Sequence, residues 1–173
     1  MPASHPKSTT VDFDAAFDEH YPGLLRYCQR LTGDRDVAED TAQESMVRLF
    51  ERGVSGPSAG MRAWLYKTAT HLVRDRYRID TNRRRLLEEN PVRPGEPESP
   101  ERTLEREETR VRARRALDTL PHRYREILLM RYSGFSYKEI ADAVDVAATS
   151  VGTLLARAER KFADALTDAG EAA

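Results

Sequence analysis

A run of basic and aromatic side chains in residues 62–86 is the strongest candidate for chemistry in this sequence. Eight arginines and lysines stand there against two aspartates, and the aromatic residues interleaved with them are Trp64, Tyr66, His71 and Tyr77. Cationic groups bind phosphates and aromatic rings stack on unpaired bases, so this composition is typical of a surface that holds single-stranded nucleic acid. The alternative is an ordinary solvated helix face, with Trp64 in the core.

The stretch YKEIADAVDVAATSVGTLLARA, residues 137–158, has the apolar spacing of a helix-turn-helix. If Ala141 is the small residue where the two helices cross, the required apolar positions hold Ile140, Val144, Val146, Val151 and Leu154. Asp145 occupies the turn position, which needs a left-handed backbone that aspartate tolerates better than most residues. Ser136 and Glu139 predict a capping box at the start of the first helix. The alternative is a plain helical hairpin packed in a core.

The second helix of this motif would present mostly hydroxyl groups to DNA. We expect the residues that face the groove to be Thr149, Ser150, Thr153 and Arg157. Only Arg157 is basic between Val146 and Glu159, so binding to duplex DNA by this motif alone is expected to be weak. Gly152 costs about 1 kcal/mol relative to alanine inside a helix. It either lets the helix approach DNA closely or, as we favour, is a tolerated weakness.

Residues 34–52 predict a second kind of surface, with six acids against three bases. On a helix, one side would carry Asp36, Asp40, Gln43, Glu44 and Val47. Another side would carry small and apolar residues that face the core, namely Ala38, Ala42, Ser45, Met46 and Leu49. An acidic face with an apolar neighbour suits a basic protein partner, and an ordinary solvated face is the alternative.

The elements that would position these residues are all helical, because helical periodicity recurs along the chain and strand-like alternation does not. We expect a loop at 53–60 and a helix from about Met61, with an apolar stripe of Trp64, Leu65, Thr68 and Leu72 that extends to Val73. Four prolines and an excess of acids predict a linker, after which helices resume near Glu101. The predicted organisation is two small helical domains: a tail at 1–11, an N-terminal domain at 12–86, a linker at 87–104, a C-terminal domain at 105–168 and a tail at 169–173.

The bulk properties of the 173 residues exclude several classes of function. The formal net charge is −1, so affinity for nucleic acid must come from local patches. Cys28 has no partner cysteine, and the four histidines lack the spacing of metal ligands. No catalytic motif, membrane-spanning run or signal peptide is found, so we expect no enzyme, no metal and no cofactor, and a cytoplasmic location.

Three stretches together resemble one family. They are DVAEDTAQESMVRLFE (36–51), RAWLYKTATHLVRDRYR (62–78) and ALDTLPHRYREILLMRYSGFSYKEIADAV (116–144). Over roughly Phe13 to Leu166 the chain resembles a bacterial RNA polymerase sigma factor of the extracytoplasmic-function (ECF) group, which also has two helical domains joined by a linker. The rival interpretations are a free-standing helix-turn-helix regulator and a helical adaptor without a role on DNA.

The resemblance implies a partner for each surface. The acidic helix would bind the clamp helices of the polymerase's largest subunit, chiefly through Asp40, Gln43 and Glu44. Loop 53–60 and one helix would melt the promoter element nearest the start site, using Arg62, Lys67, His71, Arg74 and Arg78. The helix-turn-helix would read the upstream element in double-stranded DNA. Two domains that each bind DNA weakly would suffice for promoter recognition, because the polymerase core tethers both at high effective concentration. An anti-sigma factor is a further possible partner.

The sequence departs from the family pattern at both DNA-reading helices. Arginine and asparagine are common in the family where Thr70 and His71 stand, and the recognition helix lacks a lysine and an arginine at Gly152 and Leu154. Base preferences therefore cannot be transferred from relatives. The terminal Ala172-Ala173 is similar to tags gripped by Clp-type proteases, although a frayed end without meaning is the simpler interpretation.

Overall fold

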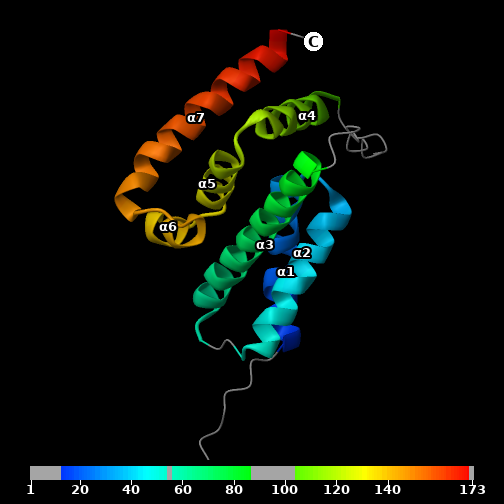
Figure 1. The fold of residues 1–173 in the computed structure, drawn as a ribbon, viewed down its shortest axis with the longest axis vertical. Coiled ribbons are helices and arrows are strands. Elements are labelled where there is room, and N and C mark those ends of the chain that lie inside the picture. Colours follow the sequence, from blue (N-terminus) through cyan, green and yellow to red (C-terminus); the bar gives the residue numbers. More distant parts are fainter. Residues whose placement is uncertain (1–12, 54–55, 87–103, 172–173) are drawn as a thin grey trace, which may run out of the picture.

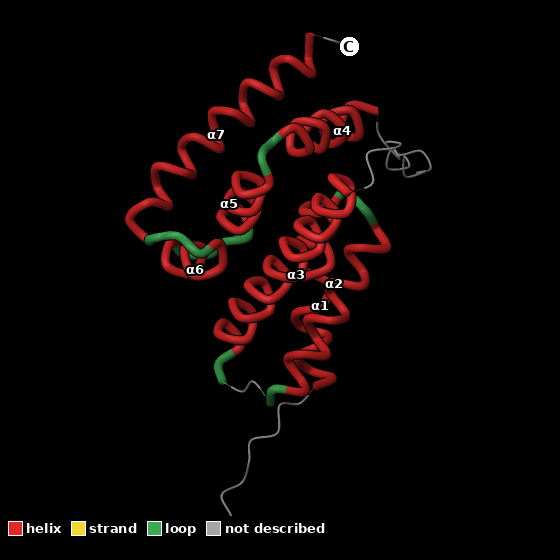
Figure 2. Tube along the Cα trace, viewed as in Figure 1, coloured by secondary structure: helices red, strands yellow, loops and turns green. Residues whose placement is uncertain are grey.

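The computed structural model describes residues 13–53, 56–86 and 104–171, with side chains over the slightly shorter ranges 13–53, 56–79 and 108–168. Within these ranges the fold is all-α, as predicted, and no strand occurs (Figures 1 and 2). The helices are α1 (Phe13–Thr32), α2 (Arg35–Glu51), α3 (Ser58–Leu86), α4 (Leu104–Thr119), α5 (His122–Tyr132), α6 (Tyr137–Val144) and α7 (Ala148–Glu171). Among the described residues, no helix is both long enough and apolar enough to span a membrane.

Helices α1, α2 and α3 form an N-terminal bundle. The tight α1–α2 connection depends on Gly33, whose φ of 72° lies in the left-handed region that glycine adopts without strain. Asp34 then caps α2, because its carboxylate accepts a hydrogen bond from the backbone N–H of Val37 at 2.9 Å. The face of α2 predicted to enter the core is buried throughout, from Ala38 to Leu49.

Helix α3 differs from its prediction at its start and in its buried stripe. It begins at Ser58 rather than near Met61, because the carbonyl of Pro57 accepts hydrogen bonds from the N–H groups of Gly60 and Met61. The predicted loop 53–60 is therefore partly helical. The buried residues of α3 are Leu65, Tyr66, Ala69, Thr70 and Val73, whereas Trp64, Thr68 and Leu72 are only half-buried. Leu65 and Val73 are buried as predicted, and the prediction is wrong for the other three because all three helices of the bundle, not the apolar pattern alone, set the orientation of α3.

A buried hydroxyl pair links α1 to α3. The Tyr27 Oη and Thr70 Oγ1 atoms are 2.7 Å apart, and Thr70 is fully buried. The Thr70 hydroxyl donates its single proton to the carbonyl of Tyr66, so Tyr27 must donate to Thr70. Burial also raises the pKa of Tyr27 well above its usual value, which keeps the phenol protonated as this donor. Thr70, where the family often has arginine, is thus a core residue in this chain.

The C-terminal helices contain the predicted helix-turn-helix in α6 and α7. Ser136 and Glu139 form the predicted capping box, in which each side chain bonds the other residue's backbone N–H. Asp145 has the predicted left-handed conformation, with φ 54° and ψ 55°. Ile140, Val144 and Val151 are buried, while Val146 and Leu154 are partly buried against the same core. Helix α4 begins at Leu104, three residues after the predicted point.

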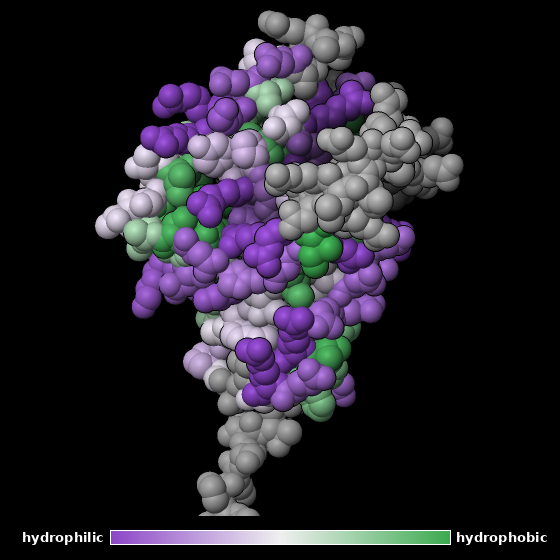
Figure 3. Space-filling model, in the orientation of Figure 1, coloured by the Kyte–Doolittle hydropathy of each residue, from purple (hydrophilic) through white to green (hydrophobic). Residues whose placement is uncertain are grey.

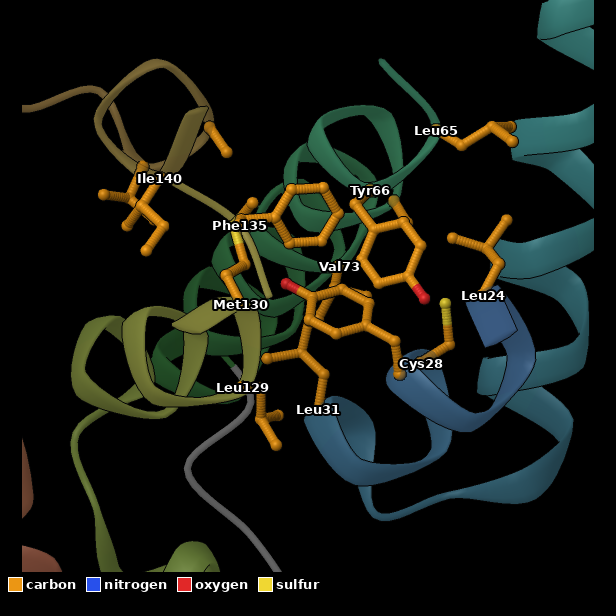
Figure 4. Close-up of a cluster of buried hydrophobic side chains, with 14 of the residues drawn as sticks. Leu24, Cys28, Leu31, Leu65, Tyr66, Val73, Leu129, Met130, Phe135 and Ile140 are labelled. Atoms are coloured by element: carbon orange, nitrogen blue, oxygen red, sulfur yellow. The ribbon is translucent and has the colours of Figure 1, made fainter. Parts of the chain in front are cut away.

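The two sets of helices pack against each other in one hydrophobic core. Helix α3 contacts α6 and α1 contacts α5, although these segments are far apart in the sequence (Figure 1). Figure 4 shows Tyr66 of α3 and Phe135 of the α5–α6 turn side by side, and their ring centroids are 4.8 Å apart. Leu31, Met130 and Val73 surround the same cluster (Figure 4). The sequence predicted two domains, and it did not predict this contact between them.

We expect Thr70→Val to lower the free energy of unfolding by about 1–3 kcal/mol, because the buried Tyr27 hydroxyl loses its acceptor. Tyr27→Phe should cost only about 1 kcal/mol, since Thr70 keeps the Tyr66 carbonyl as its partner. The double variant should cost less than the sum of the two. Urea unfolding followed by fluorescence of the single tryptophan, Trp64, measures all three values. Strictly additive costs would contradict the pairing.

Candidate nucleic-acid and partner interfaces

The acidic face predicted on α2 lies open at the surface. Its members, Asp36, Asp40, Gln43, Glu44 and Val47, are all exposed. Four of them, all except Asp36, line one groove of about 650 Å³ between α2 and α3. The structure therefore brings most of this predicted set to one concave surface.

The groove combines an apolar floor with a charged rim. Val47 is 46% exposed and Ile79 of α3 is 63% exposed, and Leu72 also lines the groove. The rim carries Asp40 and Glu44, each paired with an arginine of the lining: Arg76 lies 3.8 Å from Asp40, and Arg48 lies 2.7 Å from Glu44. Most of the molecular face drawn in Figure 3 is hydrophilic, with small and separate hydrophobic areas. Exposed apolar groups flanked by carboxylates suit an amphipathic partner that carries positive charge.

The basic face of α3 meets the C-terminal helices. The Arg62 guanidinium donates to the backbone carbonyl of Ser133 and lies 4.3 Å from the centroid of the Phe135 ring. The His71 Nε2 atom lies 3.0 Å from the carbonyl oxygen of Ala143. These side chains were predicted to contact DNA, and here they contact protein.

Arg74 makes the most extensive of these contacts. Its Nη2 and Nε atoms donate to the two carboxylate oxygens of Glu126 at 2.9 and 3.3 Å, and its Nη1 atom donates to Asp145 at 2.8 Å. Burial alone would lower the pKa of Arg74, but the bonds and charges of Glu126 and Asp145 raise it above its usual value. The guanidinium is therefore held as a cation with every nitrogen engaged.

Glu126 is a fully buried acid in the C-terminal core, with 0% of its surface exposed. Burial alone would raise the pKa of its carboxyl, but hydrogen bonds from His122 and Arg74, together with their charges, lower the pKa below its usual value. The His122 Nδ1 atom lies 3.0 Å from the carboxylate, and the His122 ring stacks on Tyr77 of α3. The net effect keeps Glu126 ionised at neutral pH.

Arg78 and Lys67, the other two residues predicted to take part in melting, form fewer contacts with protein. Arg78 is exposed and lies 3.7 Å from Asp75 on its own helix. Lys67 is half-buried. Of the five predicted side chains, the structure thus brings Arg62, His71 and Arg74 together against α5 and α6.

The predicted reading face of α7 is free of the domain contact. Thr149, Ser150, Thr153 and Arg157 are all exposed, while the opposite side of the helix buries Val151, Leu155 and Ala158. The helical period explains this division, because it places the predicted reading residues on the side of α7 opposite the packing residues. A β-carbon at Gly152 would lie 3.6 Å from a ring carbon of Tyr137, which is ordinary van der Waals contact. The fold itself therefore does not require glycine at this position.

The described residues contain no group of three or more His, Cys, Asp or Glu side chains that could hold a metal ion. Cys28 is buried, and burial raises the pKa of its thiol to about 12, so it is not a reactive thiolate. Ala172 and Ala173 lie outside the described residues, so the degradation tag stays a hypothesis.

Sequence reasoning missed the acids that bind the basic face, Glu126 and Asp145. Glu126 did carry a signal, because it is a single acid directly before the apolar run ILLM (127–130). A buried acid implies a cationic partner. The partner, Arg74, lies 52 residues away, and nothing in the sequence identifies it.

Comparison with known proteins agrees with the two-part architecture and its helix-turn-helix. The model of sigma-70 region 2 matches residues 16–83, and the model of sigma-70 region 4 matches residues 110–162. The ECF RNA polymerase sigma factor SigE of Mycolicibacterium smegmatis is 30% identical over 183 residues, covering 95% of this chain and 70% of the relative. EcfG of Rhodopseudomonas palustris, also an ECF sigma factor, is 34% identical over 149 residues, covering 80% of this chain and 75% of the relative.

A solved structure has the same fold. It is the sigma factor RpoE in complex with the anti-sigma factor NepR, from Bartonella quintana, with a TM-score of 0.66 and 20% identity over 90% of this chain and 97% of that chain. The fold and matched regions define a protein of transcription initiation. This chain belongs to the ECF group of RNA polymerase sigma factors, which direct the polymerase to promoters.

We expect Gly152→Ala to raise the free energy of unfolding by up to about 1 kcal/mol, because alanine is the better helix former and its β-carbon fits against Tyr137. If Gly152 is a tolerated weakness, promoter-specific transcription stays unchanged. Thermal unfolding monitored by circular dichroism and run-off transcription measure the two effects. A stable variant with reduced transcription would instead show that the helix needs glycine to approach DNA.

Proposed function

We propose that the exposed face of α2 binds the clamp helices of the largest polymerase subunit. The contacting residues would be Asp40, Gln43, Glu44 and Val47, with Asp36 at the edge of the surface. The observation that carries this assignment is the groove between α2 and α3, which exposes Val47 and Ile79 beside the carboxylates of Asp40 and Glu44. Arg76 and Arg48 pair with these two carboxylates in the free chain, so a basic partner would compete with them. A basic amphipathic surface would bury Val47 and Ile79 and pair with the carboxylates of the rim.

The basic face of α3 and loop 53–60 would bind and melt the promoter element nearest the start site. Arg62, Lys67, His71, Arg74 and Arg78 supply the cationic and hydrogen-bonding groups. Each base taken out of the stack costs a few kcal/mol, which contacts to the loop must offset. Residues 54 and 55 of this loop lie outside the described residues.

Helix α7 would read the upstream element in the major groove through Thr149, Ser150, Thr153 and Arg157. Their common exposure on one side of α7 supports this role. With one guanidinium on that face, the helix forms few phosphate contacts and binds weakly without a tether. An anti-sigma factor is a further proposed partner, supported by the NepR complex of the structurally similar RpoE.

Run-off transcription with core polymerase and a promoter library tests the proposed function. The chain should direct initiation from a distinct set of promoters, and neither the chain nor core alone should do so. A gel-shift without core polymerase tests the free-standing regulator. Tight, specific binding of duplex DNA by the chain alone, with no effect of core, would favour that regulator.

Asp40→Ala combined with Gln43→Ala should weaken binding to core polymerase by about tenfold or more, because both side chains line the groove that we propose as the interface. Both residues are exposed, so the circular dichroism spectrum and the unfolding temperature should stay unchanged. Asp18→Ala combined with Gln29→Ala removes the same two residue types from α1 and is the control; Gln29 is half-buried, so the unfolding temperature of this variant is measured as well. Surface-immobilised core polymerase measures the affinities, and normal affinity of the α2 variant would refute the interface.

A further inference from the structure

A small pocket lies where α1, the first turns of α3 and the end of α5 meet, and its lining is positively charged. The pocket has a volume of about 210 Å³. Arg26 and Arg30 come from α1 and Arg62 comes from α3, while none of the residues that line the pocket is an acid. Arg62 also belongs to the proposed melting face, but Arg26 and Arg30 have no part in the proposed function.

The three guanidinium groups of this pocket form no ion pair with an acid in the part of the chain that the structure describes. Arg26 and Arg30 are exposed at its rim. Arg62 donates to the neutral backbone carbonyl of Ser133, which leaves its positive charge uncompensated. Because like charges that line one small pocket repel each other, a bound anion would lower the electrostatic energy there.

One acid, Glu139, is influenced by Arg62 but is engaged outside the pocket. Hydrogen bonds with Ser136 are the main reason that the pKa of the Glu139 carboxyl is lowered, and the charge of Arg62 adds to the effect. The carboxylate accepts bonds from the backbone N–H and the hydroxyl of Ser136 at 2.8 and 2.7 Å, and Glu139 does not line the pocket. Glu139 therefore caps α6 and leaves the pocket available to an external anion.

The Tyr66 hydroxyl adds a neutral hydrogen-bond donor to the wall of the pocket. Tyr66 is buried, and Figure 4 shows its hydroxyl directed toward α1. Burial raises the pKa of this phenol, and the positive charges of Arg62 and Arg26 offset only part of that rise. The hydroxyl therefore stays protonated at neutral pH and can donate to an anion that the arginines hold.

Gly23 of α1 makes room for this hydroxyl. A β-carbon at position 23 would lie 3.1 Å from the Tyr66 Oη atom, which is closer than ordinary van der Waals contact, and 4.0 Å from the Arg26 Nη2 atom. Glycine inside a helix costs about 1 kcal/mol relative to alanine. The absence of a side chain at Gly23 allows the phenol and the Arg26 guanidinium to approach the same point on α1.

We propose that this pocket binds a multiply charged phosphoryl group, as found in pyrophosphate or a nucleoside diphosphate. A guanidinium forms paired hydrogen bonds with phosphate oxygens, and three guanidinium groups match such an anion better than a single carboxylate. Tyr132 is 76% exposed and lines the same pocket, so its ring offers a surface on which the base of a nucleotide stacks. The backbone of DNA is the other source of phosphoryl groups, with one charge per phosphate, and the test distinguishes the two sources.

Isothermal titration calorimetry of the full chain with sodium pyrophosphate and, separately, with ADP tests the site at constant ionic strength. The parent chain should bind both compounds. Arg26→Gln combined with Arg30→Gln should weaken binding by about tenfold or more, which corresponds to the loss of one charge-assisted hydrogen bond. Gly23→Ala should also weaken binding although it changes no charge, because the added β-carbon displaces the Tyr66 hydroxyl.

Arg110→Gln combined with Arg112→Gln is the matched control, since both residues are exposed on α4, outside the pocket, and the substitutions remove the same charge. This variant should bind pyrophosphate as the parent does. An equal loss of affinity in the control, or a parent chain that does not bind pyrophosphate, overturns the proposal. The exposed arginine variants keep the test decisive if Gly23→Ala is unstable, and circular dichroism verifies that each variant is folded.

A short single-stranded DNA, titrated into the same variants, identifies the source of the phosphoryl group. Equal affinity for this DNA in the parent and in the Arg26 and Arg30 variant, with pyrophosphate binding lost, supports a small phosphorylated ligand. A parallel loss of both affinities, with competition between DNA and pyrophosphate in the parent, supports a phosphoryl site that the DNA backbone occupies. The test requires no polymerase, so its result is independent of whether the chain initiates transcription.

Discussion

The ion pair between Arg74 and Glu126 is the interaction on which the arrangement of the molecule depends. A buried carboxylate needs hydrogen-bonding and cationic partners to stay charged; His122 of the same domain is one partner, and the guanidinium comes from the other half of the chain. Loss of one partner of a buried pair typically costs about 3–5 kcal/mol, because an uncompensated charge remains. The second acceptor, Asp145, lies in the turn of the helix-turn-helix. The turn between α6 and α7 is thereby linked to α3.

The same acid explains why the covered and open surfaces are distributed as they are. Glu126 lies on α5, so it draws α3 toward α5 and α6 and leaves α2 and the outer side of α7 in solvent. In this arrangement the surface of α2 that we propose for polymerase binding stays exposed.

The sequence predicted the local features well. The capping box at Ser136 and Glu139, the left-handed Asp145 and the buried side of α2 follow from residue types at fixed spacing, and the structure confirms them. It predicted the buried stripe of α3 less well. Tyr66 and Thr70 are buried through tertiary contacts with α1, which cannot be deduced from the spacing of apolar residues within α3. The residues predicted on each functional face of α2 and α7 are exposed, although their roles in binding remain predictions.

The contact between the domains could not be predicted from the sequence. Arg74 and Glu126 are separated by 52 positions, and the bases of α3 have the composition of a nucleic-acid surface whether or not a carboxylate covers them. The sequence of a basic helix shows that the helix is positively charged, but it does not show which acidic group binds there. A long-range ion pair depends on tertiary packing, which here joins α1 to α5 and α3 to α6. For that reason sequence analysis identified the DNA-binding candidates and missed their competitor.

The most direct measurement of the central claim is the distance between the two domains, in the parent chain and in Arg74→Ala. Spin labels at Asp18→Cys on α1 and Glu159→Cys on α7 occupy exposed positions, while the native Cys28 is buried and unreactive. Double electron–electron resonance should give one narrow distance distribution for the parent chain and a longer or broader distribution for Arg74→Ala, in which Glu126 has lost its partner from α3. The same distribution in both chains would contradict the account.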